Sequence, residues 1–408
     1  MTDRLTRARL PTPSSEDVAS RRRELGWALR ALCMTETVSY GVLYYAFPVL
    51  AGSITADTGW SVTAITADFS AALVVAGLAG VFVGRLLDRH GPRWVMTGAS
   101  ILGVVSVVVI ATAPTFWVFT VGWLLAGVAM SGVFYPPAFT AVTVWFGPDR
   151  LRALTAITLL AGLASTIFAP LTAALNAHLS WRATYLVLAV VLAVLTVPAH
   201  LIALRPAWRH PEPSRAEPDA PDPESQSVDR GVFVLLAAAF TIVDLCVYAT
   251  IVGTVPLIEE RGFSTAAASW ALGIAGLGQV LGRLGYARLA RHVALRTRTV
   301  AIFGVSVITT ALFAVLPGPY ALLVVVSLVA GNARGLTTLL SATAISDRWG
   351  TLRYARLNGV FNAPLTIASA VAPFIGAGVA AVFGGYPAAF GAFAALGLVA
   401  VLLVIRRR

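Results

Sequence analysis

The sequence predicts an all-α polytopic membrane protein with twelve transmembrane helices, arranged as two six-helix pseudo-repeats. The chain of 408 residues is 58% hydrophobic and only 12% charged, and its mean hydropathy of +0.81 lies outside the range of soluble domains. Its apolar residues form runs of about 20 or more, the length that crosses a bilayer as a helix. A polar break divides these runs into two sets of six.

The predicted spans are bounded by charged or turn-forming residues. In the first half they cover residues 26–52, 61–87, 94–113, 116–140, 151–175 and 183–204. In the second half they cover residues 232–258, 266–284, 299–316, 320–345, 357–383 and 387–405. Of the prolines within these spans, those at positions 48, 136, 137, 170 and 373 predict bends.

Three polar segments complete the predicted domain organisation of two bundles, residues 26–204 and 232–405. Residues 1–25 form a basic tail with six arginines and no apolar core, which a cleavable signal peptide would need. Residues 205–231 hold six prolines among Asp, Glu, Arg and Ser, so we expect a disordered linker. Residues 406–408 form a short C-terminal end.

The arginines predict the orientation of the chain. With an even number of spans both termini lie on one side, and all 30 basic residues, which are arginines, fall there except Arg182, Arg261 and Arg334. The positive-inside rule therefore predicts a multi-pass plasma-membrane protein with cytoplasmic N- and C-termini. Because the arginines occupy short loops rather than one continuous face, we expect the lipid bilayer and a small-molecule solute as partners, not nucleic acid. We expect a monomer.

Metal and enzyme chemistry have no sequence support. Cys33 and Cys246 lie inside apolar runs, and the five histidines are scattered without a metal-ligand spacing. The loops are too short for a catalytic domain, and no nucleophile lies near a base. We therefore predict no metal site, no cofactor and no enzyme activity.

A charged turn between the second and third spans is the most informative motif. It runs Gly84-Arg85-Leu86-Leu87-Asp88-Arg89-His90-Gly91-Pro92-Arg93. Gly84 removes a side chain where two helices meet, and Gly91 with Pro92 makes the turn. Asp88 lies between arginines with which it can pair.

Short matches between the two halves indicate an internal duplication. Gly59-Trp60-Ser61 before the second span is echoed by Gly262-Phe263-Ser264 before the eighth. Gly84-Arg85-Leu86 is likewise echoed by Gly282-Arg283-Leu284. A further echo joins Trp145-Phe146-Gly147 to Arg348-Trp349-Gly350.

The charged turn, the six-plus-six spans and the central linker resemble the major facilitator superfamily of transporters. Within it, Gly59-Trp60-Ser61, Asp88-Arg89-His90-Gly91-Pro92-Arg93 and Trp181-Arg182 resemble the monocarboxylate and oxalate/formate type. The resemblance implies a major facilitator fold and a cytoplasmic gate at the turn, to which we assign Gly84, Asp88, Arg89, Gly91 and Arg93.

Few ionisable side chains lie at membrane depth, where each is costly and faces a cavity or a partner. They are Glu36, Asp68, Asp244 and Arg334. Arg334 is near the midplane, and Ser327, Gly331, Thr338 and Ser341 lie on its helical face, so we predict an anion-binding or ion-pairing site. For Asp68, near the outer end of its span, a hydrated vestibule position is expected.

Aromatic and amide side chains accompany the mid-span charges. Tyr40 and Tyr44 follow Glu36 at helical spacing, Tyr248 follows Asp244, and Asn362 belongs to a polar row with Asn358 and Thr366. The family resemblance implies that spans one, four, seven and ten line a central cavity. Arg334, Asp244, Glu36, Tyr40, Tyr44, Tyr248 and Asn362 are therefore our substrate-binding or coupling candidates.

The predicted function is secondary active transport of a small organic solute by alternating access, with a proton gradient as the energy source. Arg334 and the resemblance favour an organic anion such as a monocarboxylate. An exporter of an amphiphilic drug or secondary metabolite is the first alternative, and for it the aromatic residues matter more than Arg334. A solute sensor that does not transport is the second.

Overall fold

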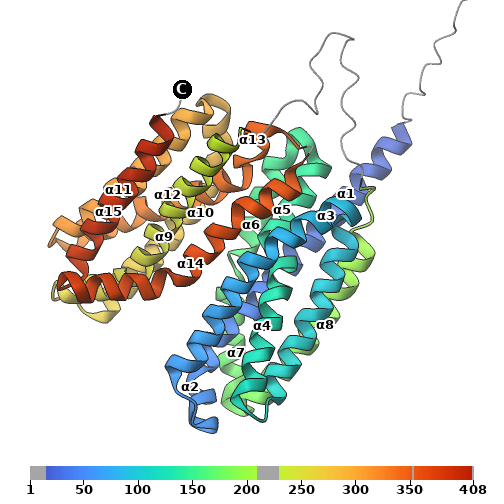
Figure 1. Ribbon diagram of the computed structural model, residues 1–408, viewed down its shortest axis with the longest axis horizontal. Helices are drawn as coiled ribbons and strands as arrows, with labels where there is room; N and C mark the ends of the chain where they lie inside the picture. The colour runs from blue at the N-terminus through green and yellow to red at the C-terminus, as the bar shows by residue number, and fades with distance from the viewer. Residues whose placement is uncertain (1–14, 209–228, 352, 407–408) are drawn as a thin grey trace, which may run out of the picture.

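Two groups of helices lie side by side, and each is formed by one half of the chain (Figure 1). The computed structural model describes residues 15–208, 229–351 and 353–406. Within these ranges the chain forms helices and loops without a β-strand, so the predicted all-α class is confirmed. Residues 1–14 of the predicted tail, residues 209–228 of the predicted linker and the last two residues of the chain lie outside the described ranges.

The first half contains eight α-helices, a π-helix and a 3₁₀-helix within its described residues. These are α1 (Ser15–Tyr40), η1 (Gly41–Tyr45, π), α2 (Ala46–Thr58), α3 (Val62–Thr112), α4 (Phe116–Val133), α5 (Tyr135–Phe146), η2 (Gly147–Asp149, 3₁₀), α6 (Arg150–Ala161), α7 (Ala164–His178) and α8 (Trp181–Ala203).

The second half contains seven α-helices within its described residues. These are α9 (Arg230–Glu260), α10 (Thr265–His292), α11 (Leu295–Val315), α12 (Tyr320–Ala344), α13 (Ser346–Trp349), α14 (Tyr354–Phe383) and α15 (Tyr386–Ile405).

The helices are consistent with the predicted twelve spans. Nine helical stretches of the described chain are long and apolar enough to cross a membrane. Two of them, Val62–Thr112 and Phe116–His178, each hold two predicted spans, and α10 supplies the remaining one. In α3 the two spans are separated at Gly91, whose φ of 72° is open to glycine, and Pro92 follows it.

Three predicted spans are interrupted in the structure. A π-helix, η1, divides the first span between α1 and α2. The fourth is broken at Phe134, where the backbone is extended. The fifth is broken at Gly162 and Leu163, between α6 and α7. The first helix also begins at Ser15, eleven residues before the predicted start of the span.

The start of α1, the end of α8, the start of α9 and the end of α15 lie at one end of the bundle, which we call the terminal side (Figure 1). The halves meet most extensively where α3 packs on α14. A Cβ at Gly84 would lie 2.6 Å from the carbonyl oxygen of Ala355, and one at Gly359 would lie 2.6 Å from that of Gly80. Smaller contacts join α5 to α14 and α6 to α10. Away from the terminal side the two groups of helices diverge.

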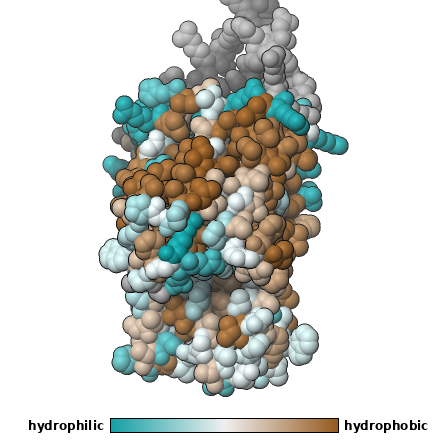
Figure 2. Space-filling model, turned by 90° about the vertical axis from the view of Figure 1, so that its left-hand side faces the viewer, coloured by the Kyte–Doolittle hydropathy of each residue, from teal (hydrophilic) through white to brown (hydrophobic). Residues whose placement is uncertain are grey.

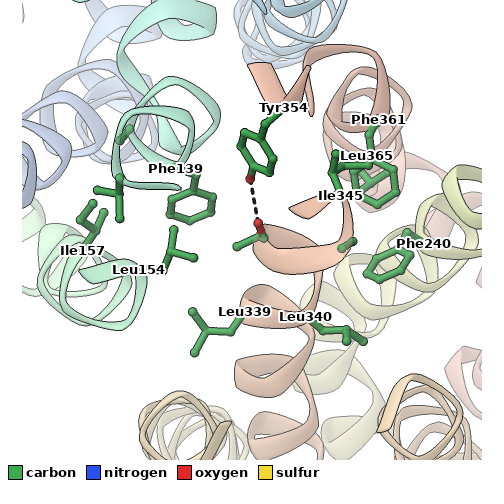
Figure 3. Packing of buried hydrophobic residues seen from close by; sticks show 14 of the residues in the cluster. Phe139, Leu154, Ile157, Phe240, Leu339, Leu340, Ile345, Tyr354, Phe361 and Leu365 are labelled. Atoms are coloured by element: carbon green, nitrogen blue, oxygen red, sulfur yellow. Dashed lines mark hydrogen bonds between the residues drawn. The ribbon is translucent and has the colours of Figure 1, made fainter. Parts of the chain in front are cut away.

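An apolar cluster also joins the halves (Figure 3). Phe139, Leu154 and Ile157 of α5 and α6 face Leu339 of α12 and Tyr354 of α14. The hydroxyl of Tyr354 donates to the carbonyl of Ala342 at 2.7 Å. Burying this apolar surface stabilises the closed contact between the halves.

Candidate functional site

Arg334 lies 14 residues into α12 and 10 residues from its end. At about 1.5 Å per residue, this is near mid-depth. Its guanidinium lies over the ring of Tyr248 in α9, 5.4 Å from the ring centroid. The side chain is half-buried. Figure 2 shows hydrophilic side chains around a recess beside a broad apolar surface of the molecule.

The surroundings of Arg334 come from both halves of the chain. It interacts electrostatically with Asp244 of α9 and with Tyr44 and Tyr45 of η1. Among the described residues, neither Arg334 nor Asp244 forms an ion pair within 4 Å. The structure therefore brings together four of the predicted residues, Arg334, Asp244, Tyr44 and Tyr248, without pairing the two opposite charges directly.

Aromatic rings of the first half extend this site. Tyr40 stacks on Phe134, with ring centroids 4.0 Å apart and planes 9° apart, and contacts Tyr135 at 4.9 Å. Tyr40 also meets Tyr44 edge-on at 6.4 Å. Phe134 reaches this position because the chain is extended there and Pro136 then starts a new helix.

Glu36 lies in α1, one turn before Tyr40. Its side chain is fully buried, and neither carboxylate oxygen has a hydrogen-bond partner among the described residues. Tyr40 and Tyr135 both interact electrostatically with it. Glu36 thus lies behind the aromatic rings of the first half, and no direct contact joins it to Arg334 within the part of the chain that is described.

Asn362 and Asp68 occupy packing positions. The side-chain amide of Asn362 donates to the backbone and side-chain oxygens of Asn358, at 2.9 and 2.8 Å. Asn358 in turn donates to the carbonyl of Pro136 in the other half, at 3.4 Å. Asp68 accepts from the Thr120 hydroxyl at 2.9 Å and is 8% exposed. The predicted hydrated vestibule position of Asp68 is therefore wrong, because α4 covers its side chain.

The predicted polar face of Arg334 is largely a packing face. The hydroxyls of Ser327, Thr338 and Ser341 donate to carbonyls of their own helix. A Cβ at Gly331 would lie 1.9 Å from the carbonyl oxygen of Ala275 in α10. No described group of three or more His, Cys, Asp or Glu side chains is placed to hold a metal ion.

The charged turn packs against the end of α8 and the start of the predicted linker. The backbone carbonyl of Asp88 accepts from the indole of Trp208 at 3.3 Å, and that indole packs against Gly91. Arg93 donates to the carbonyl of Leu201 at 2.8 Å, whereas Arg89 is exposed. Of the five predicted gate residues, Gly84 lies at the contact between the halves.

Polar links between the halves involve residues that sequence reasoning did not select. Arg150 of α6 pairs with Asp347 of α13 at 2.8 Å, and Asp347 also pairs with Arg298 of α11. Arg283 of α10 donates to the carbonyl of Thr158 at 2.6 Å, just before the break in the fifth span. The repeat of Gly-Arg-Leu pointed to Arg283 in the sequence. A repeat, however, does not show that the Arg283 side chain contacts the other half.

The sequence profile described as Major Facilitator Superfamily matches residues 32–363, most of the chain. The chain belongs to the Major Facilitator Superfamily. The predicted superfamily is thus confirmed, and membership of a family of transporters agrees with the prediction that the chain is not an enzyme.

Individual relatives are distant. The chain is 25% identical over 154 residues to the uncharacterized MFS-type transporter YcxA of Bacillus subtilis, which covers 38% of this chain and 37% of YcxA. It is 28% identical over 148 residues to the transcription regulatory protein OpdE of Pseudomonas aeruginosa, covering 36% and 35%. The match spans about a third of the length of these curated relatives.

Solved structures share the fold. The human organic anion transporter MFSD10 superposes with a TM-score of 0.69 at 18% identity, over 94% of this chain and 99% of that one. At this identity the similarity establishes the architecture alone.

Proposed function

We propose that the protein is a secondary active transporter that moves a small organic anion, such as a monocarboxylate, by alternating access of its two halves. Superfamily membership supports transport. The predicted monocarboxylate or oxalate/formate subtype rests on the motifs around Gly59, Asp88 and Trp181. The contacts between the halves on the terminal side fit one end state of a rocking mechanism, in which the opposite side is open.

Arg334 is the observation that carries the preference for an anion. A guanidinium at mid-depth costs roughly 2.5–3.5 kcal/mol on insertion scales and is retained where it has a partner or a function. Within the described chain no carboxylate lies within 4 Å of it, and a tyrosine ring supports one face. A solute carboxylate would supply the missing acceptor through charge-assisted hydrogen bonds.

The electrostatic interaction between Arg334 and Asp244 supports the proposal of proton coupling. A solute carboxylate that engages Arg334 weakens the interaction of Arg334 with Asp244 and adds a second negative charge nearby. A proton on Asp244 removes the repulsion, so uptake of solute and proton are linked. Glu36 is the second candidate for proton uptake, since it is buried and its carboxylate has no hydrogen-bond partner in the described part of the chain.

The arginine distribution supports a cytoplasmic terminal side, and therefore an outward-open state for this arrangement of the halves. Arg85, Arg89, Arg150, Arg152 and Arg288 belong to loops or helix ends that the positive-inside rule assigns to that side. We assign the protein to the plasma membrane on the same ground.

The Arg334→Gln variant tests the anion site. Small acids, including lactate, oxalate and benzoate, are first screened by thermal shift on the purified protein. Liposome flux of the acids that protect it is then measured. Losing a charged hydrogen bond of about 1.5–3 kcal/mol predicts roughly 10- to 150-fold weaker binding.

The matched control is Arg288→Gln, because Arg288 is exposed in the last two turns of α10. This variant should bind the acid as the wild type does. An acid that binds Arg334→Gln with wild-type affinity would contradict the anion site.

Two alternatives predict different results in the same assays. The name of OpdE, a transcription regulatory protein, favours a solute sensor, which would bind an acid without any liposome flux. The aromatic rings around Tyr40 favour an exporter of amphiphiles, which would be protected by neutral amphiphiles whether or not Arg334 is present.

A further inference from the structure

We infer that the solute is a planar aromatic carboxylate, held by its carboxylate on Arg334 and by its ring among tyrosine rings of both halves. This inference rests on the anion site of the proposed function and narrows its solute class. It is carried by a group of five tyrosines. Tyr248 lies under that guanidinium, and Tyr44 and Tyr45 interact with it electrostatically. Tyr40 and Tyr135 extend the group from Tyr44.

The five tyrosines form one connected group. Tyr44 meets Tyr45 edge-on at 5.1 Å and Tyr40 at 6.4 Å, and Tyr40 contacts Tyr135 at 4.9 Å. Tyr248 of the other half supports Arg334 and interacts electrostatically with Tyr40, Tyr44 and Tyr45. Rings of both halves therefore act on the cation, Tyr248 from the second half and Tyr44 and Tyr45 from the first.

Two adjacent tyrosines, Tyr44 and Tyr45, take part, and their rings meet edge-on. They lie at the end of η1, where the wider turn changes the helical register, and both act on Arg334. π-helical turns inside α-helices are frequent at functional sites.

The hydroxyls of these tyrosines are available to a ligand. The hydroxyls of Tyr286, Tyr320 and Tyr354 each bond to a neighbouring protein atom. By contrast, none of the five site hydroxyls has a hydrogen bond within the described residues, and none is a fully enclosed polar atom. Polar groups that stay open beside a cation are typical of a ligand site rather than of a packed core.

An aromatic acid matches this chemistry better than an aliphatic one. Its carboxylate is coplanar with the ring, so a guanidinium that binds the carboxylate edge-on leaves the ring faces free. Tyrosine rings then contact those faces in offset or edge-to-face geometry, a gain that a puckered aliphatic ring does not obtain. The phenolic hydroxyls add hydrogen bonds at the rim.

Benzoate and cyclohexanecarboxylate form the test pair, because they have equal charge and similar size and differ in aromaticity. Their affinities are measured by isothermal titration on the full-length protein in detergent. We expect benzoate to bind about fivefold more tightly, the ratio typical of an aromatic contact. Equal affinities, or tighter binding of cyclohexanecarboxylate, would overturn the inference.

Variants then locate the preference. Tyr44→Leu should abolish the benzoate preference, whereas Tyr44→Phe, which keeps the ring, should retain it. Phe374→Leu is the matched control, since this aromatic side chain is 84% exposed on α14, and its preference should equal that of the wild type. A preference that survives Tyr44→Leu would contradict the placement of the ring.

The two proposals fail in different ways. If both acids bind with equal affinity and Arg334→Gln abolishes both, the anion site stands and the aromatic class is wrong. If neither acid binds in a way that depends on Arg334, the anion site itself is wrong.

Discussion

Asp244 and Glu36 are both carboxyl groups at membrane depth, yet their surroundings differ. Asp244 lies beside Arg334 at the opening between the halves and is half-buried. Glu36 is fully buried in α1 behind Tyr40, without a hydrogen-bond partner among the described residues. Only Asp244 is placed to sense directly whether Arg334 is occupied by a solute, so the two residues should contribute differently to coupling.

The first prediction concerns Asp244→Asn. Asparagine keeps the shape and removes the charge, so binding of a solute to Arg334 should no longer be linked to a proton. We expect acid flux in liposomes to continue but to lose its response to an imposed pH gradient. Asp149→Asn, on an exposed residue of the terminal side, should respond like the wild type.

The result that would remove Asp244 from the coupling mechanism is a full pH response in Asp244→Asn. Glu36→Gln is assayed in parallel. If both variants keep the full pH response, neither carboxyl group couples solute to protons.

The position of each charged residue along its span was predictable, but its partners were not. Hydropathy places Arg334 at mid-depth because the residue lies near the middle of a long apolar run. Spacing alone could not show that Tyr45 joins Tyr44 at Arg334, since their separation by one residue excludes a shared face in an α-helix. Nor could it show that α4 covers Asp68, which depends on packing between helices.

At the scale of helices, the apolar runs predicted the spans, and two of the predicted prolines lie at breaks. Pro48 follows the π-helix η1 by three residues. Pro136 lies at the start of α5, where the fourth span is interrupted. Pro170 and Pro373 lie inside α7 and α14. The fifth span instead breaks at Gly162, where a Cβ would lie 2.8 Å from the Arg283 guanidinium. Hydropathy predicts which segments lie in the membrane, but it does not predict contacts between particular residues of different helices.

Four glycines set the distance between α10 and α12. Cβ atoms at Gly278 and Gly282 would lie 2.1 and 2.2 Å from carbonyl oxygens of α12. Those at Gly331 and Gly335 would lie 1.9 and 2.1 Å from carbonyl oxygens of α10. Small residues four apart on both helices allow the backbones to touch. This close crossing fixes α12, and therefore the depth and direction of Arg334.

The prediction at this scale is that Gly331→Ala destabilises the second half. The added methyl group overlaps backbone atoms of α10, so the helices must separate, at about 1–3 kcal/mol in the free energy of unfolding. Gly304→Ala in α11 is the control, because nothing lies within 4 Å of its added Cβ. Thermal unfolding in detergent is the measurement. We expect a lower unfolding temperature for Gly331→Ala and an unchanged one for Gly304→Ala. Equal unfolding temperatures of the two variants would contradict the close crossing.

For the whole molecule, the polar links between halves cluster on the terminal side. Asp347 joins Arg150 of the first half to Arg298 of the second, next to the apolar cluster of Figure 3. Alternating access requires these contacts to break when the opposite side closes. The family resemblance implied a gate at the charged turn from Gly84 to Arg93, and we propose that Asp347 is part of it. The pair of Arg150 and Asp347 could not be predicted from the sequence, because the two residues are far apart in the chain and only the fold brings them together.

The last prediction is that Asp347→Asn shifts the equilibrium towards the state open on the terminal side. Losing the charge weakens bonds to two arginines by about 1.5 kcal/mol, roughly tenfold in the ratio of the two states. Spin labels on cysteines replacing Arg152 and Arg356, two exposed positions of opposite halves, report the opening by pulsed electron resonance, since native Cys33 and Cys246 are buried. The distance distribution should broaden to longer values in Asp347→Asn and stay unchanged in the exposed control Asp149→Asn.

Combining Asp347→Asn with Arg150→Gln should add little to the shift, because both changes remove the same contact. Fully additive shifts, or an unchanged distribution in Asp347→Asn, would show that this ion pair does not hold the terminal side closed.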